Sequence, residues 1–137
     1  MVNFFMKPNS KNYLEWFKKA QDDELNGRSI LKHRDGAPSG VCFLAQQMAE
    51  KYLKGLLVYH NRPFRKIHDL VELETLLQNY NNDIADLHDD FILLNRFYVK
   101  TRYPGNYPEF SWQDAEEAMA AAEKIKEFVL ERIKAEK

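Results

Sequence analysis

The sequence has a single cysteine, Cys42, and no long apolar run among its 137 residues. One thiol cannot form an internal disulfide or a cysteine-based zinc site, which excludes disulfide scaffolds and zinc ribbons. No segment approaches the roughly 18 consecutive apolar residues of a membrane helix, and residues 1–10 lack the apolar core and cleavage site of a signal peptide. We therefore expect a cytoplasmic protein without membrane contact.

Glycine and proline are also scarce, with five residues of each, and they cluster in a few places. The long stretches between them contain no helix breaker, and no period-two alternation bounded by hairpin turns indicates a strand. A chain of 137 residues suits one domain better than two. The sequence therefore predicts a single all-α domain over residues 1–137, ordered from about 10 to 134. We expect an up-and-down bundle of about five helices, with a four-helix core and one short helix.

Five segments carry apolar residues at helical spacing, and the second of them is the most regular. Residues 61–66 contain Pro63 and are expected to form a loop. The expected helices run from a Ser10 cap to about Asp35, from Ser39 or Gly40 to about His60, from an Asp69 cap to about Tyr80, from an Asp83 cap to about Tyr98, and onward from a capping box of Ser111 and Asp114.

Several chemistries lack the residues that they need. None of the four histidines has a glutamate three residues before it, and no His-Glu-x-x-His motif occurs. The glycines form no phosphate-binding loop either. We therefore predict neither a metal site nor a bound cofactor. Cys42 stands between Val41 and Phe43, an apolar context that favours a buried side chain over a nucleophile.

The net charge is only −1, yet the charges are unevenly distributed. Between positions 50 and 68 Glu50 is the only acid, and no acid occurs between Asp90 and Glu109. If successive helices run antiparallel, the ends of the second and fourth helices lie close together and two basic clusters meet. Such a basic end suits a phosphate with a base stacked nearby, although charge runs are more often solvated faces. The basic residues are Lys51, Lys54, Arg62, Arg65, Lys66, Arg96, Lys100 and Arg102, and the tyrosines are Tyr98, Tyr103 and Tyr107.

Polar residues follow one face of the second predicted helix. Gln47, Lys51 and Lys54 share a face by their spacing, and Glu50 lies four residues before Lys54, where the two can form an ion pair. Gln46 and Gln47 lie beside a mostly apolar face, and half-buried amides need hydrogen-bond partners. We expect the two glutamines to bridge to another helix or to another subunit.

Three stretches of the chain resemble the HEPN domain family. They are residues 42–57 (Cys-Phe-Leu-Ala-Gln-Gln-Met-Ala-Glu-Lys-Tyr-Leu-Lys-Gly-Leu-Leu), 67–70 (Ile-His-Asp-Leu) and 101–104 (Thr-Arg-Tyr-Pro). The resemblance extends from about Tyr13 to the last helix and includes the order and spacing of the three stretches. It implies an all-α bundle, commonly a homodimer, that is often encoded beside a small nucleotidyltransferase. Among the proteins it resembles, some are RNA-cutting toxins neutralised by that partner and others are nucleotide-binding modules.

Members that cut RNA are similar in carrying an Arg-x4-6-His motif that works without a metal. The segments Arg28 to His33 and Arg62 to His68 both match this spacing. By the resemblance, however, the nuclease motif belongs on a late helix, whereas the first segment ends the first predicted helix and the second contains Pro63. A ribonuclease activity is therefore an alternative and not the main prediction.

We predict a HEPN-like module whose basic end binds the phosphate of a nucleotide or RNA. It would act as a homodimer with a nucleotidyltransferase partner, in a toxin–antitoxin pair. His68 and Asp69 match one family motif and Arg102 and Tyr103 another, although a helix start and a helix stop also explain them. The predicted ligand-binding residues are Gln47, Lys51, Lys54, His68, Asp69, Arg102 and Tyr103.

Two alternatives stay open. The first is a metal-independent endoribonuclease with His68 as acid–base and Arg102 or Arg62 as the stabilising cation, so that His68 and Arg102 are the candidate catalytic residues. The second is a non-catalytic dimeric interaction protein, in which aromatic residues contribute to the dimer seam. The aromatic residues in question are Trp16, Phe91, Phe97 and Trp112.

Overall fold

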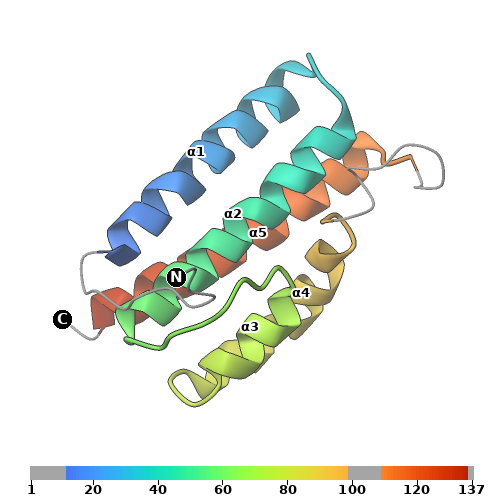
Figure 1. Cartoon of the computed structure of the whole chain (residues 1–137). Helices are drawn as coiled ribbons and strands as arrows, with labels where there is room; N and C mark the ends of the chain where they lie inside the picture. The colour runs from blue at the N-terminus through green and yellow to red at the C-terminus, as the bar shows by residue number, and fades with distance from the viewer. Residues whose placement is uncertain (1–11, 99–108, 136–137) are drawn as a thin grey trace.

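The residues described by the computed structural model, 12–98 and 109–135, form helices joined by loops and contain no strand. The predicted all-α bundle of about five helices is confirmed (Figure 1). None of these helices is long enough and apolar enough to cross a membrane. The elements are α1 (Asn12–His33), α2 (Pro38–Tyr59), α3 (Leu70–Leu77), the 3-10 helix η1 (Asn82–Leu87), α4 (His88–Asn95) and α5 (Trp112–Ala135).

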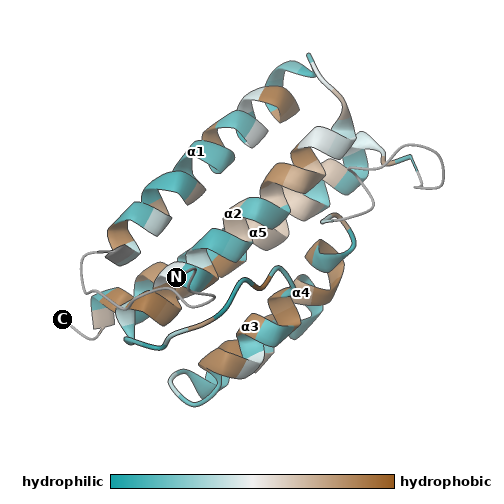
Figure 2. Ribbon diagram, viewed as in Figure 1, coloured by the Kyte–Doolittle hydropathy of each residue, from teal (hydrophilic) through white to brown (hydrophobic). Residues whose placement is uncertain are grey.

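The core forms around α2, which packs against both α1 and α5 (Figure 1). Most α2 side chains from Val41 to Val58 are buried, among them Met48, Tyr52 and Leu56 at the predicted helical spacing. The other two long helices are amphipathic, and Figure 2 shows hydrophilic residues along much of α1. Each of them buries an apolar stripe and leaves its polar residues in water.

An extended segment, residues 60–69, carries the chain from the end of α2 back to its middle, where His68 meets Glu50. Helix α3 then runs away again, and α4 returns beside it (Figure 1). The end of α4 consequently lies beside the start of α2, where the ring centroids of Tyr98 and Phe43 are 6.4 Å apart. The expectation that the ends of the second and fourth helices meet is wrong, because residues 60–69 already reverse the chain before α3 begins.

Two of the predicted helix starts have the expected side-chain caps. The Asp69 carboxylate accepts a hydrogen bond from the backbone N–H of Val71 at the start of α3. Before α5, the Ser111 hydroxyl accepts from the N–H of Asp114, and the Asp114 carboxylate accepts from the N–H of Ser111. The predicted capping box is therefore confirmed.

The predicted cap at Asp83 is wrong, and Ser10 lies outside the described residues. Asn82–Leu87 form a 3-10 helix, and α4 begins only at His88, without a side-chain cap. Ile84 and Leu87 are both buried, and the three-residue period of a 3-10 helix places them on one face. The Asp83 carboxylate pairs instead with the guanidinium of Arg132 on α5.

Candidate functional site

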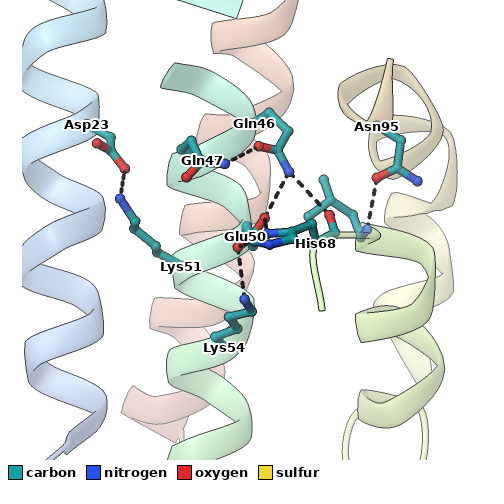
Figure 3. A network of polar contacts seen from close by, with 9 residues as sticks. Asp23, Gln46, Gln47, Glu50, Lys51, Lys54, His68 and Asn95 are labelled. Atoms are coloured by element: carbon teal, nitrogen blue, oxygen red, sulfur yellow. Dashed lines mark hydrogen bonds and ion pairs between the residues drawn. The ribbon is translucent and has the colours of Figure 1, made fainter. Parts of the chain in front are cut away.

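The buried carboxylate of Glu50 is the centre of a polar network between α2 and residues 60–69 (Figure 3). Its Oε1 accepts a hydrogen bond from Gln46 Nε2 at 3.1 Å, and its Oε2 accepts one from Lys54 Nζ at 2.9 Å. His68 Nδ1 lies 3.2 Å from Oε1 and 3.1 Å from Oε2. Only 4% of Glu50 is exposed, and these donors offset the cost of removing its charge from water.

Helical spacing explains why three members of the network meet. Gln46, Glu50 and Lys54 follow one another at intervals of four residues, so they share one face of α2. Gln46 Nε2 also donates to the backbone carbonyl of His68 at 3.3 Å, and Gln46 Oε1 accepts from Gln47 Nε2 at 2.6 Å. The predicted bridge by the glutamines therefore joins α2 to the loop of the same chain and not to another helix.

Lys54 and Lys51, both predicted to bind a ligand, have carboxylate partners within the chain. The predicted Glu50–Lys54 ion pair is confirmed, and it is buried, since 5% of Lys54 is exposed. Lys54 Nζ also lies 5.7 Å from the ring centroid of Trp16, a cation–π distance. Lys51 Nζ lies 2.6 Å from Asp23 Oδ2 on α1. Neither ammonium group therefore adds an uncompensated charge to the surface.

His68 extends from this network to the surface, and 32% of its side chain is exposed. Its ring stacks on that of Tyr98, with a centroid distance of 4.4 Å and an angle of 16° between the planes. One face of Tyr98, predicted as a platform for a base, is thus covered by His68. Within the described part of the chain, Nε2 of His68 has no hydrogen-bond partner, whereas Nδ1 is held by Glu50.

Asp69 and Asn95 fix the junction between the loop and α3. Asp69 Oδ1 accepts from the N–H of Val71 at 2.9 Å and from Asn95 Nδ2 at 2.8 Å. Asn95 Oδ1 accepts from the backbone N–H of Leu70 at 2.9 Å. The observed contacts of Asp69 are those of a helix cap. Asn95 was missed by the sequence analysis, because a single asparagine on a short helix gives no signal for its partners.

Residues 62–68 form a basic loop that carries three cationic side chains and no acid. Phe64 and Ile67 are buried and anchor the loop to the core, which leaves the cations at the surface. No ion pair joins these cations to any described residue. The three cationic residues are Arg62, which is partly exposed, and Arg65 and Lys66, which are exposed.

Of the remaining predicted basic residues, only Arg96 is described. Arg96 lies at the end of α4, with its guanidinium 5.6 Å from the ring centroid of Phe97. The predicted site residues Arg102 and Tyr103 fall within positions 99–108, outside the described residues, and so do Lys100 and Tyr107.

A buried acid on α1 was not predicted from the sequence. Glu24 is 6% exposed and accepts hydrogen bonds from Arg28 Nε at 2.9 Å and from Lys126 Nζ at 3.0 Å. Its position, four residues after the buried Ala20, belongs to the apolar stripe of the helix. An acid inside such a stripe is the signal that could have identified it.

Glu74 on α3 is a second buried acid that was not predicted, although its sequence carries the same signal. It is 3% exposed and lies four residues after the buried Leu70, again within an apolar stripe. Its Oε1 lies 2.7 Å from Nδ1 of His88, the first residue of α4. This hydrogen bond and the charge of the carboxylate raise the pKa of His88.

Cys42 is fully buried, as predicted. Burial raises the pKa of its thiol to about 12, so the group stays protonated at neutral pH and is a poor nucleophile. Across residues 12–98 and 109–135, no three histidine, cysteine or carboxylate side chains are grouped so that they could hold a metal ion.

Comparisons with known proteins agree with this architecture. The HEPN domain family matches residues 13–133. The crystal structure of TT1696 from Thermus thermophilus is similar, with a TM-score of 0.74 and 29% sequence identity, and the match covers 88% of this chain and 97% of that one. Among curated proteins no match was found. The match over residues 13–133 shows that the chain belongs to the HEPN domain family.

Proposed function

We propose that this HEPN domain binds the phosphate of a nucleotide or of RNA at the basic loop, with His68 as a direct ligand. The observation that carries the proposal is the His68 imidazole, anchored through Nδ1 on a buried carboxylate while Nε2 has no partner among the described residues. A protonated imidazole and arginine side chains are suitable donors to phosphate oxygens. Arg62 and Arg65 supply such side chains within a few residues of His68.

The other predicted ligand residues take supporting roles in this proposal. Lys54 balances the charge of Glu50, and Lys51 balances that of Asp23, so both stabilise the helix that carries the anchor. Gln47 orients Gln46, and Asp69 caps α3 immediately after His68. Arg102 and Tyr103 stay predicted ligands.

Calorimetric titration with ATP, GTP and a short single-stranded RNA, at two salt concentrations, tests the proposal. We expect binding that weakens with salt, because phosphate contacts release counterions. His68→Ala should abolish it, whereas His33→Ala, at an exposed histidine near the end of α1, should leave it unchanged. Absence of binding by the wild type, or equal binding by His68→Ala, would contradict the proposal.

A metal-independent endoribonuclease is the second candidate, and the Glu50–His68 contact is the observation that favours it. A carboxylate on one ring nitrogen lets the other nitrogen exchange a proton with a substrate, as in many acid–base catalysts. In this case RNA is cleaved in excess chelator by the wild type and by His33→Ala, and not by His68→Ala. Intact RNA after incubation with the wild type would exclude this activity under the conditions used.

We further propose that the chain acts in the cytoplasm as a homodimer and with a nucleotidyltransferase partner, in a toxin–antitoxin pair. Membership of the HEPN domain family supports this part of the proposal. Light scattering should give twice the chain mass of 16.2 kDa, and co-purification with the product of a neighbouring nucleotidyltransferase gene should give a stable complex. A monomer at high protein concentration would contradict the homodimer.

The dimer seam predicted for a purely structural protein needs revision. Phe91 and Phe97 are buried in the core of the chain itself, so they cannot line an interface. Trp16 and Trp112 pack against that core and are partly exposed. A non-catalytic interaction protein would dimerise without binding ATP or RNA, and this result would favour it over the phosphate-binding proposal.

A further inference from the structure

The contacts of Glu50 determine which nitrogen of His68 carries a proton. Lys54 Nζ lies 2.9 Å from Oε2, so the ionised carboxylate has a cation beside it. An ionised carboxylate only accepts hydrogen bonds. His68 Nδ1 lies 3.1 and 3.2 Å from its two oxygens and must therefore be the donor. A neutral imidazole has only one N–H, so its Nε2 then has a lone pair and no hydrogen.

We propose that Glu50 is a positioning residue that holds His68 with Nδ1 protonated in both charge states, so that Nε2 is the nitrogen that contacts the ligand. The neutral ring then accepts a hydrogen bond at Nε2 from a hydroxyl group, and the charged ring donates one from Nε2 to a phosphate oxygen. The identity of the ligand rests on the proposed function, whereas the assignment of the two nitrogens does not.

Two more contacts restrain the same ring. Gln46 Nε2 donates a hydrogen bond to the backbone carbonyl of His68 at 3.3 Å, and this bond fixes the position of the His68 backbone relative to α2. The Tyr98 ring stacks on the imidazole at 4.4 Å, which limits its rotation. A ring fixed at its backbone, at one face and at one nitrogen presents the other nitrogen in a constant direction, a preorganisation that favours ligand binding.

The charged groups around the His68 imidazole largely compensate one another. Glu50 and Lys54 on α2 compensate each other, Tyr98 follows α4, and Asp69 is occupied by Val71 and Asn95. A proton on His68 therefore adds one positive charge to the basic loop. Binding of a phosphate to the neutral form should take up a proton, since only the charged ring can donate from Nε2.

Nuclear magnetic resonance of the nitrogen-15-labelled wild-type chain tests the assignment directly, without ligand. In a two-bond proton–nitrogen spectrum of the neutral imidazole, we expect Nδ1 of His68 to have a pyrrole-like shift and Nε2 a pyridine-like shift. The exposed His33 is the internal control and should show exchange between both tautomers. A pyridine-like Nδ1, or tautomer exchange at His68 equal to that at His33, would overturn the proposal.

Two matched variants test whether Glu50 is the cause. Glu50→Gln should move His68 toward mixed tautomers, because an amide can donate as well as accept. Glu74→Gln is the control, since it removes the carboxylate from His88 and should leave the His68 signals in place. An unchanged His68 tautomer in folded Glu50→Gln would contradict the proposal. A fixed tautomer in a wild type that binds neither ATP nor RNA would contradict only the proposed function, and binding with a mixed tautomer would contradict only this inference.

Discussion

Each buried glutamate in the described residues has at least one basic partner. Glu50 pairs with Lys54 and contacts His68, Glu24 pairs with an arginine and a lysine, and Glu74 pairs with His88. Lysine and arginine stay charged at every pH at which proteins are usually stable, whereas histidine loses its charge near neutrality. A histidine partner is therefore the kind whose contribution to stability varies with pH near neutrality, and the pKa of His88 is raised by its carboxylate partner.

The Glu74–His88 pair should make the chain less stable as pH rises. The hydrogen bond to Glu74 raises the pKa of His88 above its ordinary value of 6.5 in the folded state. The stabilisation is thus complete below that ordinary value and is lost as pH rises through the raised pKa. Urea denaturation at about pH 6 and about pH 8 should show a larger loss in the wild type and in His33→Gln than in His88→Gln. An identical pH dependence in all three proteins would show that the pair contributes nothing.

Lys54 and Lys51 provide a comparison of a buried and a partly exposed ion pair on one helix. Lys54→Met keeps the apolar stem and leaves Glu50 without its cation, so it should lower the free energy of unfolding by about 3 to 5 kcal/mol. Lys51→Met removes the partly exposed partner of Asp23 and should cost about 1 kcal/mol or less. Equal losses in urea denaturation would show that burial of the Glu50–Lys54 pair has no energetic consequence.

At the level of helices, the contact between α1 and α2 depends on a glycine. A Cβ atom on Gly55 would lie 2.5 Å from Cε1 of Phe17, a side chain that is itself buried and cannot move freely. Gly40, in the first turn of the same helix, has no such neighbour within 4 Å. The same substitution therefore has opposite consequences at the two positions.

Gly55→Ala should destabilise the chain by about 1 to 3 kcal/mol, because it overpacks a filled interface. Gly40→Ala should stabilise it by up to about 1 kcal/mol, through the higher helix propensity of alanine. Thermal denaturation of both variants beside the wild type measures the difference. A stabilised Gly55→Ala would mean that α1 and α2 are not packed as closely as described.

The sequence predicted helix starts correctly where a side chain caps the backbone N–H of a residue close to it in the chain. The caps at Asp69 and Ser111 were predicted because the capping oxygen and the N–H it accepts from lie two or three residues apart. Asp83 has the same local signal, yet the buried side chains of Ile84 and Leu87 select a 3-10 helix there. A residue that could cap a helix does not do so when burial of the next side chains in the core selects another backbone conformation.

At the scale of the whole molecule, the site depends on how residues 60–69 return along α2. His68 is 18 residues from Glu50 in sequence, and only this return brings them into contact. The sequence predicted Glu50–Lys54 from helical spacing and predicted His68 from its motif, but it contained no sign that the three form one network. It also placed the ends of the second and fourth helices together, since a loop that reverses the chain was counted as a simple connection.

The exposed positive charge near the site differs from the predicted distribution. Lys51 and Lys54 are compensated within the bundle, so among the lysines and arginines between positions 50 and 68 only those of the basic loop have no carboxylate partner in the described structure. Long-range attraction of a phosphate therefore depends on Arg62, Arg65 and Lys66 more than on α2.

The proposed function depends on contact between His68 and the phosphate of a nucleotide or RNA. The most direct test follows the ring signals of the histidines by nuclear magnetic resonance while ATP, and separately a short single-stranded RNA, is added to the wild-type chain. We expect the His68 signals to shift and saturate at the affinity found by calorimetry, while those of the exposed His33 stay in place. Saturable binding that leaves the His68 ring unchanged, or no binding of either ligand, would contradict it.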